Sequence, residues 1–215
     1  MTDQTLLTSV QYALLEAANG GLMWESGLWT TGEMYAALDL RQQRLLKVSH
    51  LLVGVAEIPG VIGQHRYDLP DDWLATVAVA WDVPAIGTVP RKVRELPRAE
   101  MYESDLGQPA WETTDATPIV YSDADTPTRT IQLMPAPVAA GTVQLLYVPI
   151  ATAPTGLGEP LQVPDEWGTP VLKYGVLATA LAKVGRAHDP QRARYCEWRG
   201  RLGEEVTKLL LKGMG

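Results

Sequence analysis

The order of the hydrophobic periodicities along the chain constrains its fold more than any other feature. Apolar residues repeat with helical spacing near both ends, whereas the middle consists of short alternating segments separated by Pro and Gly. This order predicts an α+β protein in which a four-helix bundle carries an inserted antiparallel β-sheet or sandwich. We therefore expect residues 1–57 and 161–215 to form the bundle and residues 58–160 to form the insert.

Two helices are predicted before the insert. The first covers residues 3–18, whose apolar side chains repeat on one face, and Asn-Gly-Gly at 19–21 can end it. The second opens at Thr30, because Glu33 stands three residues later in the pattern of a capping box. Gly54 stands after its last apolar residues, so we expect that helix to end there.

The insert is predicted to contain short strands at hairpin-like spacing. In the last of them Val143, Leu145 and Tyr147 share one side, which predicts that one face of the sheet is buried. The strand candidates are residues 66–70, 74–81, 89–96, 118–121, 130–134 and 142–148.

Two further helices are predicted after the insert. The first begins after Pro164 with Asp165 as its cap, and it is apolar over most of its circumference, which predicts a central position. The last begins with Asp189 as cap and Pro190 at the first helical position. We expect the large apolar residues of the last helix to face the bundle: Tyr195, Trp198, Leu202, Val206 and Leu209.

The residues that usually carry chemistry do not form a recognisable catalytic or metal-binding pattern. His50, His65 and His188 are far apart and have no metal-ligating neighbour at helical spacing. Asp123 and Asp125 match only part of a calcium loop and are ordinary turn residues before a proline. No nucleophile elbow or phosphate loop is present. We predict no catalytic residue, no cofactor and no metal site.

Composition excludes several further classes of protein. The single cysteine, Cys196, excludes an internal disulfide and is expected to be a buried small hydrophobe. The longest apolar stretch, 171–184, is too short to span a bilayer, and the N-terminus lacks the pattern of a signal peptide, so we expect a cytoplasmic protein. The formal net charge of −7 argues against a broad grip on nucleic acid.

The last helix is basic although the chain is acidic. Residues 186–212 contain seven Lys and Arg against four Asp and Glu, and Arg194, Arg201 and Lys208 recur every seven residues on one face. One interpretation is a basic strip that docks on an acidic partner. The other is a solvated face stabilised by Glu197–Arg201 and Glu204–Lys208 pairs, four residues apart.

The order of several short motifs resembles the head-to-tail adaptor proteins of tailed bacteriophages, the group that includes the tail tubular A-type proteins. Each motif alone is ordinary strand, turn or cap chemistry, and their order and spacing carry the resemblance. The motifs are YDLPDDW at 67–73, QLMPAP at 132–137, VQLLYVP at 143–149, VPDEW at 163–167 and DPQRA at 189–193.

The resemblance implies a structural virion protein of the neck, assembled in the host cytoplasm, with no enzyme activity. It implies a ring, usually of twelve copies, below the portal protein and above the tail or nozzle proteins. During DNA ejection the genome would pass through the ring without specific binding, and the acidic balance agrees with this. No membrane is involved. We predict that the end of the last helix contacts the portal through Arg194, Arg201, Lys208, Leu210, Leu211 and Lys212.

Two other functions are compatible with the sequence. A hydrolase with a β insert would need a pocket in which titratable groups converge. A module that binds a host surface or carbohydrate would use the tryptophans of the insert, such as Trp81 and Trp111, as a stacking platform.

Overall fold

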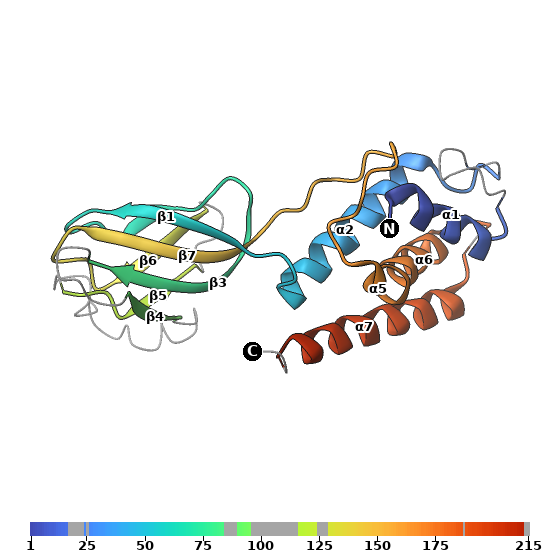
Figure 1. Ribbon diagram of the computed structural model, residues 1–215. Helices are drawn as coiled ribbons and strands as arrows, with labels where there is room; N and C mark the ends of the chain where they lie inside the picture. Colours follow the sequence, from blue (N-terminus) through green and yellow to red (C-terminus); the bar gives the residue numbers. More distant parts are fainter. Residues whose placement is uncertain are drawn as a thin grey trace. The chain divides into compact units, whose positions relative to one another are not determined.

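The chain divides into two compact units, one helical and one of β-strands. A computed structural model describes residues 1–16, 24, 26–83, 90–95, 116–123, 129–186 and 188–212. The helical unit comprises Met1–Leu52 and Ile150–Gly215, and the β unit comprises Val53–Pro149. The chain therefore leaves the helical unit once, forms the β unit and returns (Figure 1).

Four longer helices form the described part of the helical unit: α1 (Asp3–Ala13), α2 (Thr31–Ser49), α6 (Tyr174–Ala182) and α7 (Pro190–Lys212). Helix α1 begins where predicted, because the Thr2 side chain accepts a hydrogen bond from the Thr5 backbone N–H. It ends five residues earlier than predicted. Leu15 has a φ of 62°, which a right-handed helix cannot contain. Residues 19–21 lie outside the described part of the chain.

The predicted capping box at the start of α2 is confirmed. The Glu33 backbone N–H donates to Thr30 Oγ1 at 3.2 Å, and the Thr30 backbone N–H donates to Glu33 Oε2 at 2.8 Å. At the other end His50 adopts the left-handed conformation with a φ of 56° and ends the helix. Glu33 also receives Lys183 Nζ at 2.8 Å, which joins the first turn of α2 to the end of α6.

The prediction of one continuous helix capped by Asp165 was wrong. A short helix α5 (Asp165–Trp167) and a π-helix η3 (Gly168–Lys173) precede α6, and no side chain caps their first turn. Pro170 lies within the π-helix and has no N–H to donate to a regular α-helical bond. Asp165 instead pairs with the N-terminal amine of Met1.

Helix α6 lies among the other three helices, as its apolar circumference predicts, and contacts α1, α2 and α7. The helices of this unit pack at close range (Figure 1). Within the described residues, no helix combines the length and apolar character needed to cross a bilayer. Fully buried side chains from α1, α2 and α6 form the core: Leu6, Leu7, Val10, Leu38, Leu45, Leu46 and Val176.

Polar side chains of α1 and α2 hold the segment that follows the last strand. The Gln43 amide donates to Ala151 O at 2.9 Å and accepts from Ala151 N at 3.0 Å, so it pairs with this segment as a backbone unit would. The buried Asp3 carboxylate accepts the Gly156 N–H at 2.8 Å. These bonds fix the return of the chain into the helical unit.

The described part of the β unit contains one seven-stranded sheet in the order β1-β7-β3-β4-β5-β6-β2. Its strands are β1 (Gly54–Gly60), β2 (Arg66–Asp68), β3 (Trp73–Asp82), β4 (Arg91–Glu95), β5 (Val120–Ser122), β6 (Thr130–Met134) and β7 (Gly141–Pro149). All but β1 fall on predicted strands. All neighbouring strands pair antiparallel except β4 and β5, which pair parallel.

Two sequence predictions about this sheet therefore need correction. The sheet is mixed, and the chain between Glu95 and Val120 is long enough for the crossover that a parallel pair requires. The segment Gly54–Gly60, expected to bound a helix, is a strand whose seven residues all pair with β7. Pro59 is tolerated there because β1 is an edge strand of the sheet.

The sheet curves around a single hydrophobic core, to which strands from both of its edges contribute. Trp81 lies in this core with 3% of its surface exposed. A Cβ atom at Gly60 would come within 2.2 Å of the Trp81 ring, and one at Gly141 within 2.7 Å. The two glycines thus make room for the indole. Other core residues are Tyr67, Val79, Tyr121, Ile131, Leu133, Val143 and Leu145.

Candidate functional site

The predicted partner-binding residues all belong to α7, and its start is fixed by local chemistry. The Arg192 backbone N–H donates to Asp189 Oδ1 at 3.0 Å, and Ala193 N donates to Asp189 O at 2.9 Å. Pro190 occupies the first helical position, where its missing N–H has no partner to lose. The predicted cap is confirmed.

Small residues, not large ones, pack α7 against the rest of the helical unit. A Cβ atom at Gly203 would lie 2.6 Å from Val171 Cγ2 and 3.0 Å from Pro170 O, so the two backbones approach closely at η3. Glycine and other small residues allow this close approach of two helices, whereas leucine or tryptophan at the same position would prevent it. The buried residues of α7 are Ala193, Cys196, Gly200, Gly203, Glu204 and Thr207.

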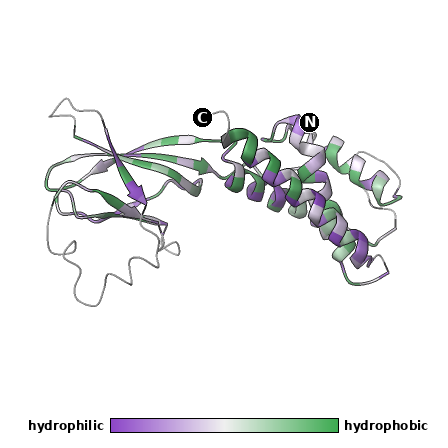
Figure 2. Cartoon of the chain, turned by 90° about the horizontal axis from the view of Figure 1, so that it is seen from below, coloured by the Kyte–Doolittle hydropathy of each residue, from purple (hydrophilic) through white to green (hydrophobic). Residues whose placement is uncertain are grey.

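The prediction that the large apolar residues of α7 face the bundle was therefore wrong. The side chain of Trp198 is 56% exposed and that of Leu209 is 67% exposed. Tyr195 and Trp198 rest against each other, with ring centroids 6.0 Å apart. We call these residues the apolar stripe, and its members are Tyr195, Trp198, Leu202, Val206 and Leu209. Apolar and charged residues alternate along α7 (Figure 2).

The three basic residues predicted to share a face do lie on one side of α7, next to the apolar stripe. Successive residues rotate by about 100° around a helix, which places Arg194, Arg201 and Lys208 within a narrow sector. Arg194 and Arg201 are exposed, and Lys208 is half-buried. We call these three residues the basic edge.

Within the part of the chain that the structure describes, Arg201 is the member of the basic edge that bonds to another side chain. Arg201 Nε donates to Glu197 Oε1 at 3.0 Å, which confirms one of the two predicted pairs. Arg41 of α2 donates to Glu197 Oε2 at 2.7 Å. Burial raises the pKa of the Glu197 carboxyl, but the bonds from Arg41 and Arg201 outweigh it and lower that pKa below its ordinary value. Glu197 is therefore a charged link between α2 and α7.

The second predicted pair, Glu204 with Lys208, is replaced by another ion pair. Glu204 is buried and accepts Arg44 of α2 at 3.0 Å. Glu204 lies on the packed side of α7, where it pairs with Arg44 of α2 and not with Lys208. As a result Arg41 and Arg44 supply the cations for the acidic residues of the packed side.

The structure places Leu210 and Leu211 away from the basic edge, whereas helical rotation places position 212 in the same sector as Arg194. Leu210 is 54% exposed on the opposite border of the apolar stripe. Leu211 is half-buried toward the packed side. Lys212 ends α7, and the following 213–215 lie outside the described residues. The spacing of the small residues along α7 was the sequence signal that could have identified the packed side.

The residues considered for other functions have structural roles or fall outside the description. Trp81 is buried, so it cannot be a stacking platform for a sugar, and Trp111 lies outside the described residues. Asp125 also lies outside them, while Asp123 borders β5. Asp72 accepts a hydrogen bond from the Tyr147 hydroxyl at 3.0 Å. Among the described residues, no group of three or more His, Cys, Asp or Glu could hold a metal ion.

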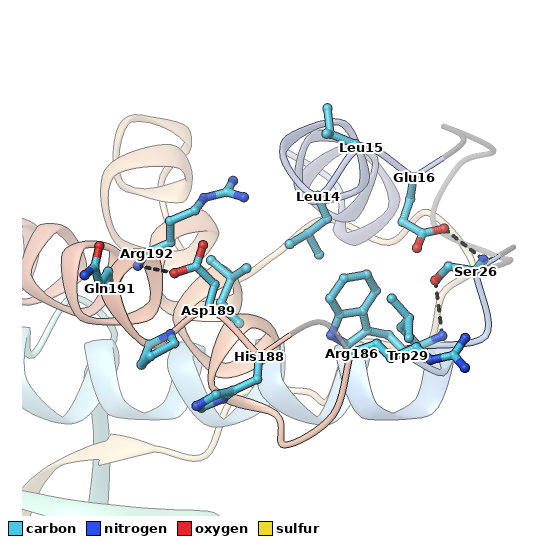
Figure 3. A pocket seen from close by; sticks show the side chains of 13 residues that line it. Leu14, Leu15, Glu16, Ser26, Trp29, Arg186, His188, Asp189, Gln191 and Arg192 are labelled. Atoms are coloured by element: carbon cyan, nitrogen blue, oxygen red, sulfur yellow. Dashed lines mark hydrogen bonds between the residues drawn. The ribbon is translucent and has the colours of Figure 1, made fainter.

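A cavity of about 670 Å³ opens beside the start of α7 (Figure 3). Its two acidic side chains already make structural bonds: Asp189 caps α7, and Glu16 accepts the Ser26 N–H at 3.2 Å. Trp29 forms one wall and donates its indole N–H to Ala180 O at 3.0 Å. Asp189, Glu16 and the Trp29 indole N–H therefore stabilise the fold through these bonds.

Comparison with known proteins supports the resemblance drawn from the motifs. The family model described as SU10 adaptor protein matches residues 1–209. The match covers both units and nearly all of α7, and it confirms the resemblance to head-to-tail adaptors of tailed phages. No curated protein matches the chain in sequence.

Proposed function

Because the chain belongs to the family of SU10 adaptor proteins, we propose that it forms a ring of twelve copies between the portal and the tail. The portal protein lies above the ring, and tail or nozzle proteins lie below it. The genome passes through the central channel when it is ejected. In this proposal the four helices of each copy form a bundle, the β unit is a domain inserted into it, and assembly takes place in the host cytoplasm.

The portal contact is inferred from the basic edge, because Arg194 and Arg201 are exposed there on a chain that is acidic as a whole. Helix α7 contains six Lys and Arg against three Glu, while the whole chain carries a net charge of −7. A basic surface of this kind is complementary to an acidic protein surface. We assign the portal contact to Arg194, Arg201, Lys208, Leu210, Leu211 and Lys212.

The acidic balance of the chain supports the passage of DNA without binding. Affinity for nucleic acid that is independent of sequence comes mainly from Lys and Arg. A channel lined by excess negative charge repels phosphates, so DNA can slide through it. The proposed role is structural and needs no turnover, cofactor or metal.

The experiment is complementation of a phage that lacks this gene with variants of the chain. Deletion of 210–215 should leave helical content and thermal unfolding close to those of the natural protein, since Leu210 is exposed and Leu211 is only half-buried. It should also yield DNA-filled heads without tails, counted by electron microscopy. Normal tail attachment by the truncated chain would place the portal contact elsewhere, with α1 as the next candidate.

A matched pair of charge variants isolates the basic edge. Arg194→Gln combined with Lys208→Gln should lower the fraction of tailed particles by about tenfold or more, because each charged contact repeats around the ring. Lys47→Gln combined with Lys173→Gln removes the same charge from other helices of the unit. That control should leave the fraction of tailed particles unchanged.

A further inference from the structure

The apolar stripe of α7 is too large and too continuous for a surface that stays in water. It places five large side chains on one side of the helix over more than three turns, with exposed fractions between 41% and 67%. Two of the five are aromatic and already in contact with each other. Soluble monomers rarely expose a contiguous apolar patch beyond a few hundred Å², and larger patches mark interaction sites.

Arginines border the apolar stripe on both sides. Arg194, Arg201 and the exposed Glu205 lie on one border, and helical rotation places Arg192 and Arg199 on the other. On the second border Arg199 lies over the Tyr174 ring at 4.9 Å, and Arg192 donates to Ala13 O at 3.2 Å. The stripe is therefore an apolar band between two borders that each carry a net positive charge.

This charge pattern decides which surface can cover the apolar stripe. Two stripes packed on each other would bring borders of net positive charge together in either orientation, and like charges at close range oppose such a contact. The covering surface must be apolar and bordered by acidic residues. Outside α7 this chain carries 22 Asp and Glu against 12 Lys and Arg, so the rest of the chain has a net charge of the required sign.

We propose that the apolar stripe of α7 is a self-association site that docks on a different, acidic surface of a second copy of this chain. The contact is heterologous, because the stripe of one copy meets another part of its neighbour. Such a contact repeats from copy to copy and can close into a ring. The inference rests on the proposed ring for its closure, and it assigns the apolar stripe to the neighbouring copy and the basic edge to the portal.

Photo-cross-linking from the centre of the stripe identifies what covers it. The photoreactive, apolar residue p-benzoylphenylalanine replaces Leu202 in the full chain, and irradiation is done on purified virions. The expected product is a ladder that starts at twice the chain mass of 23.5 kDa, with cross-linked peptides from outside α7. The same residue at position 47, on the exposed side of α2, should give at most a tenth of that product.

Other products would overturn the proposal. A cross-link only to the portal or a tail protein would show that another partner covers the stripe. A cross-link within a single chain would show that the chain covers its own stripe, and an α7-to-α7 cross-link would show that the contact is two-fold. Cross-links between copies would appear even if the chain lay outside the neck, so this result is independent of the proposed place in the virion.

A charged variant gives a second test that does not need the photoreactive chain. Leu202→Asp should keep the helical signal and unfolding midpoint of the natural protein, because position 202 is outside the core. When the Leu202→Asp chain is coexpressed with the natural chain, the number of tailed particles should fall more than tenfold. Each variant copy can still be bound by one neighbour, but its own stripe cannot bind the next copy, so the ring does not close. Lys47→Asp, coexpressed with the natural chain in the same way, is the control. The proposed contact would be wrong if Leu202→Asp left the yield of tailed particles unchanged, or if Lys47→Asp reduced it equally.

Discussion

Gly203 of α7 and Val171 of η3 are so close that a Cβ atom at position 203 would lie 2.6 Å from Val171 Cγ2. This proximity decides which side of α7 is packed. The packed side can contain only small residues at this point, so the large apolar side chains of the helix face outward.

The two glycines of α7 should respond in opposite ways to the same substitution. Gly203→Ala forces Val171 and the Pro170 carbonyl to shift, and we expect a loss of about 1–3 kcal/mol in the free energy of unfolding. At Gly200 an added Cβ finds its nearest atoms at 3.6 Å, an ordinary contact. Gly200→Ala should therefore be neutral or stabilise by up to about 1 kcal/mol through helix propensity. Urea unfolding of both variants measures the difference, and equal effects would contradict the packing.

Acid should weaken the link between α2 and α7. The pKa of Glu197 in the folded protein lies below its ordinary value of 4.5, so its contribution to stability is complete above pH 4.5 and is lost as pH falls through the lowered pKa. Glu197→Gln should therefore flatten the decline of the unfolding free energy between pH 5 and pH 3, relative to the natural protein.

Arg41→Gln provides the matched variant for this prediction. It removes the 2.7 Å partner of Glu197, so it should flatten the same part of the pH profile, and the double variant should add little to either single change. If the two single effects were additive, Glu197 would not act through Arg41.

The thiol of Cys196 should be protected while α7 is packed. Burial raises its pKa, and the thiolate is the form that reacts. A thiol reagent at pH 7.5 should therefore label the native chain at least tenfold more slowly than the chain in denaturant. One equivalent of thiol should react after unfolding, because Cys196 is the single cysteine. Rapid labelling of the native protein would show that the small-residue side of α7 is open.

Features that depend on neighbouring residues could be predicted from the sequence. The Thr30–Glu33 capping box and the Asp189-Pro190 helix start are local chemistry, and both form as predicted. Strands with a regular alternation, such as β6 and β7, were also identified.

Features that depend on distant parts of the chain could not be predicted in this way. Residues 54–60 contain Gly and Pro, which predicted the end of a helix, but pairing with β7 makes them a strand. The orientation of α7 depends on how closely η3 approaches it. The spacing of apolar residues within α7 carries no information about that approach. The basic edge was predictable by its spacing of seven, whereas Leu210 and Leu211 fall on other sides of the helix.

The most direct test of the adaptor assignment is a cryo-electron reconstruction of the virion neck in which this chain is located. We predict a closed ring of twelve copies between the portal and the tail, with the basic edge of each copy against the portal. Density for the chain in the capsid shell or in a distal fibre would contradict the account.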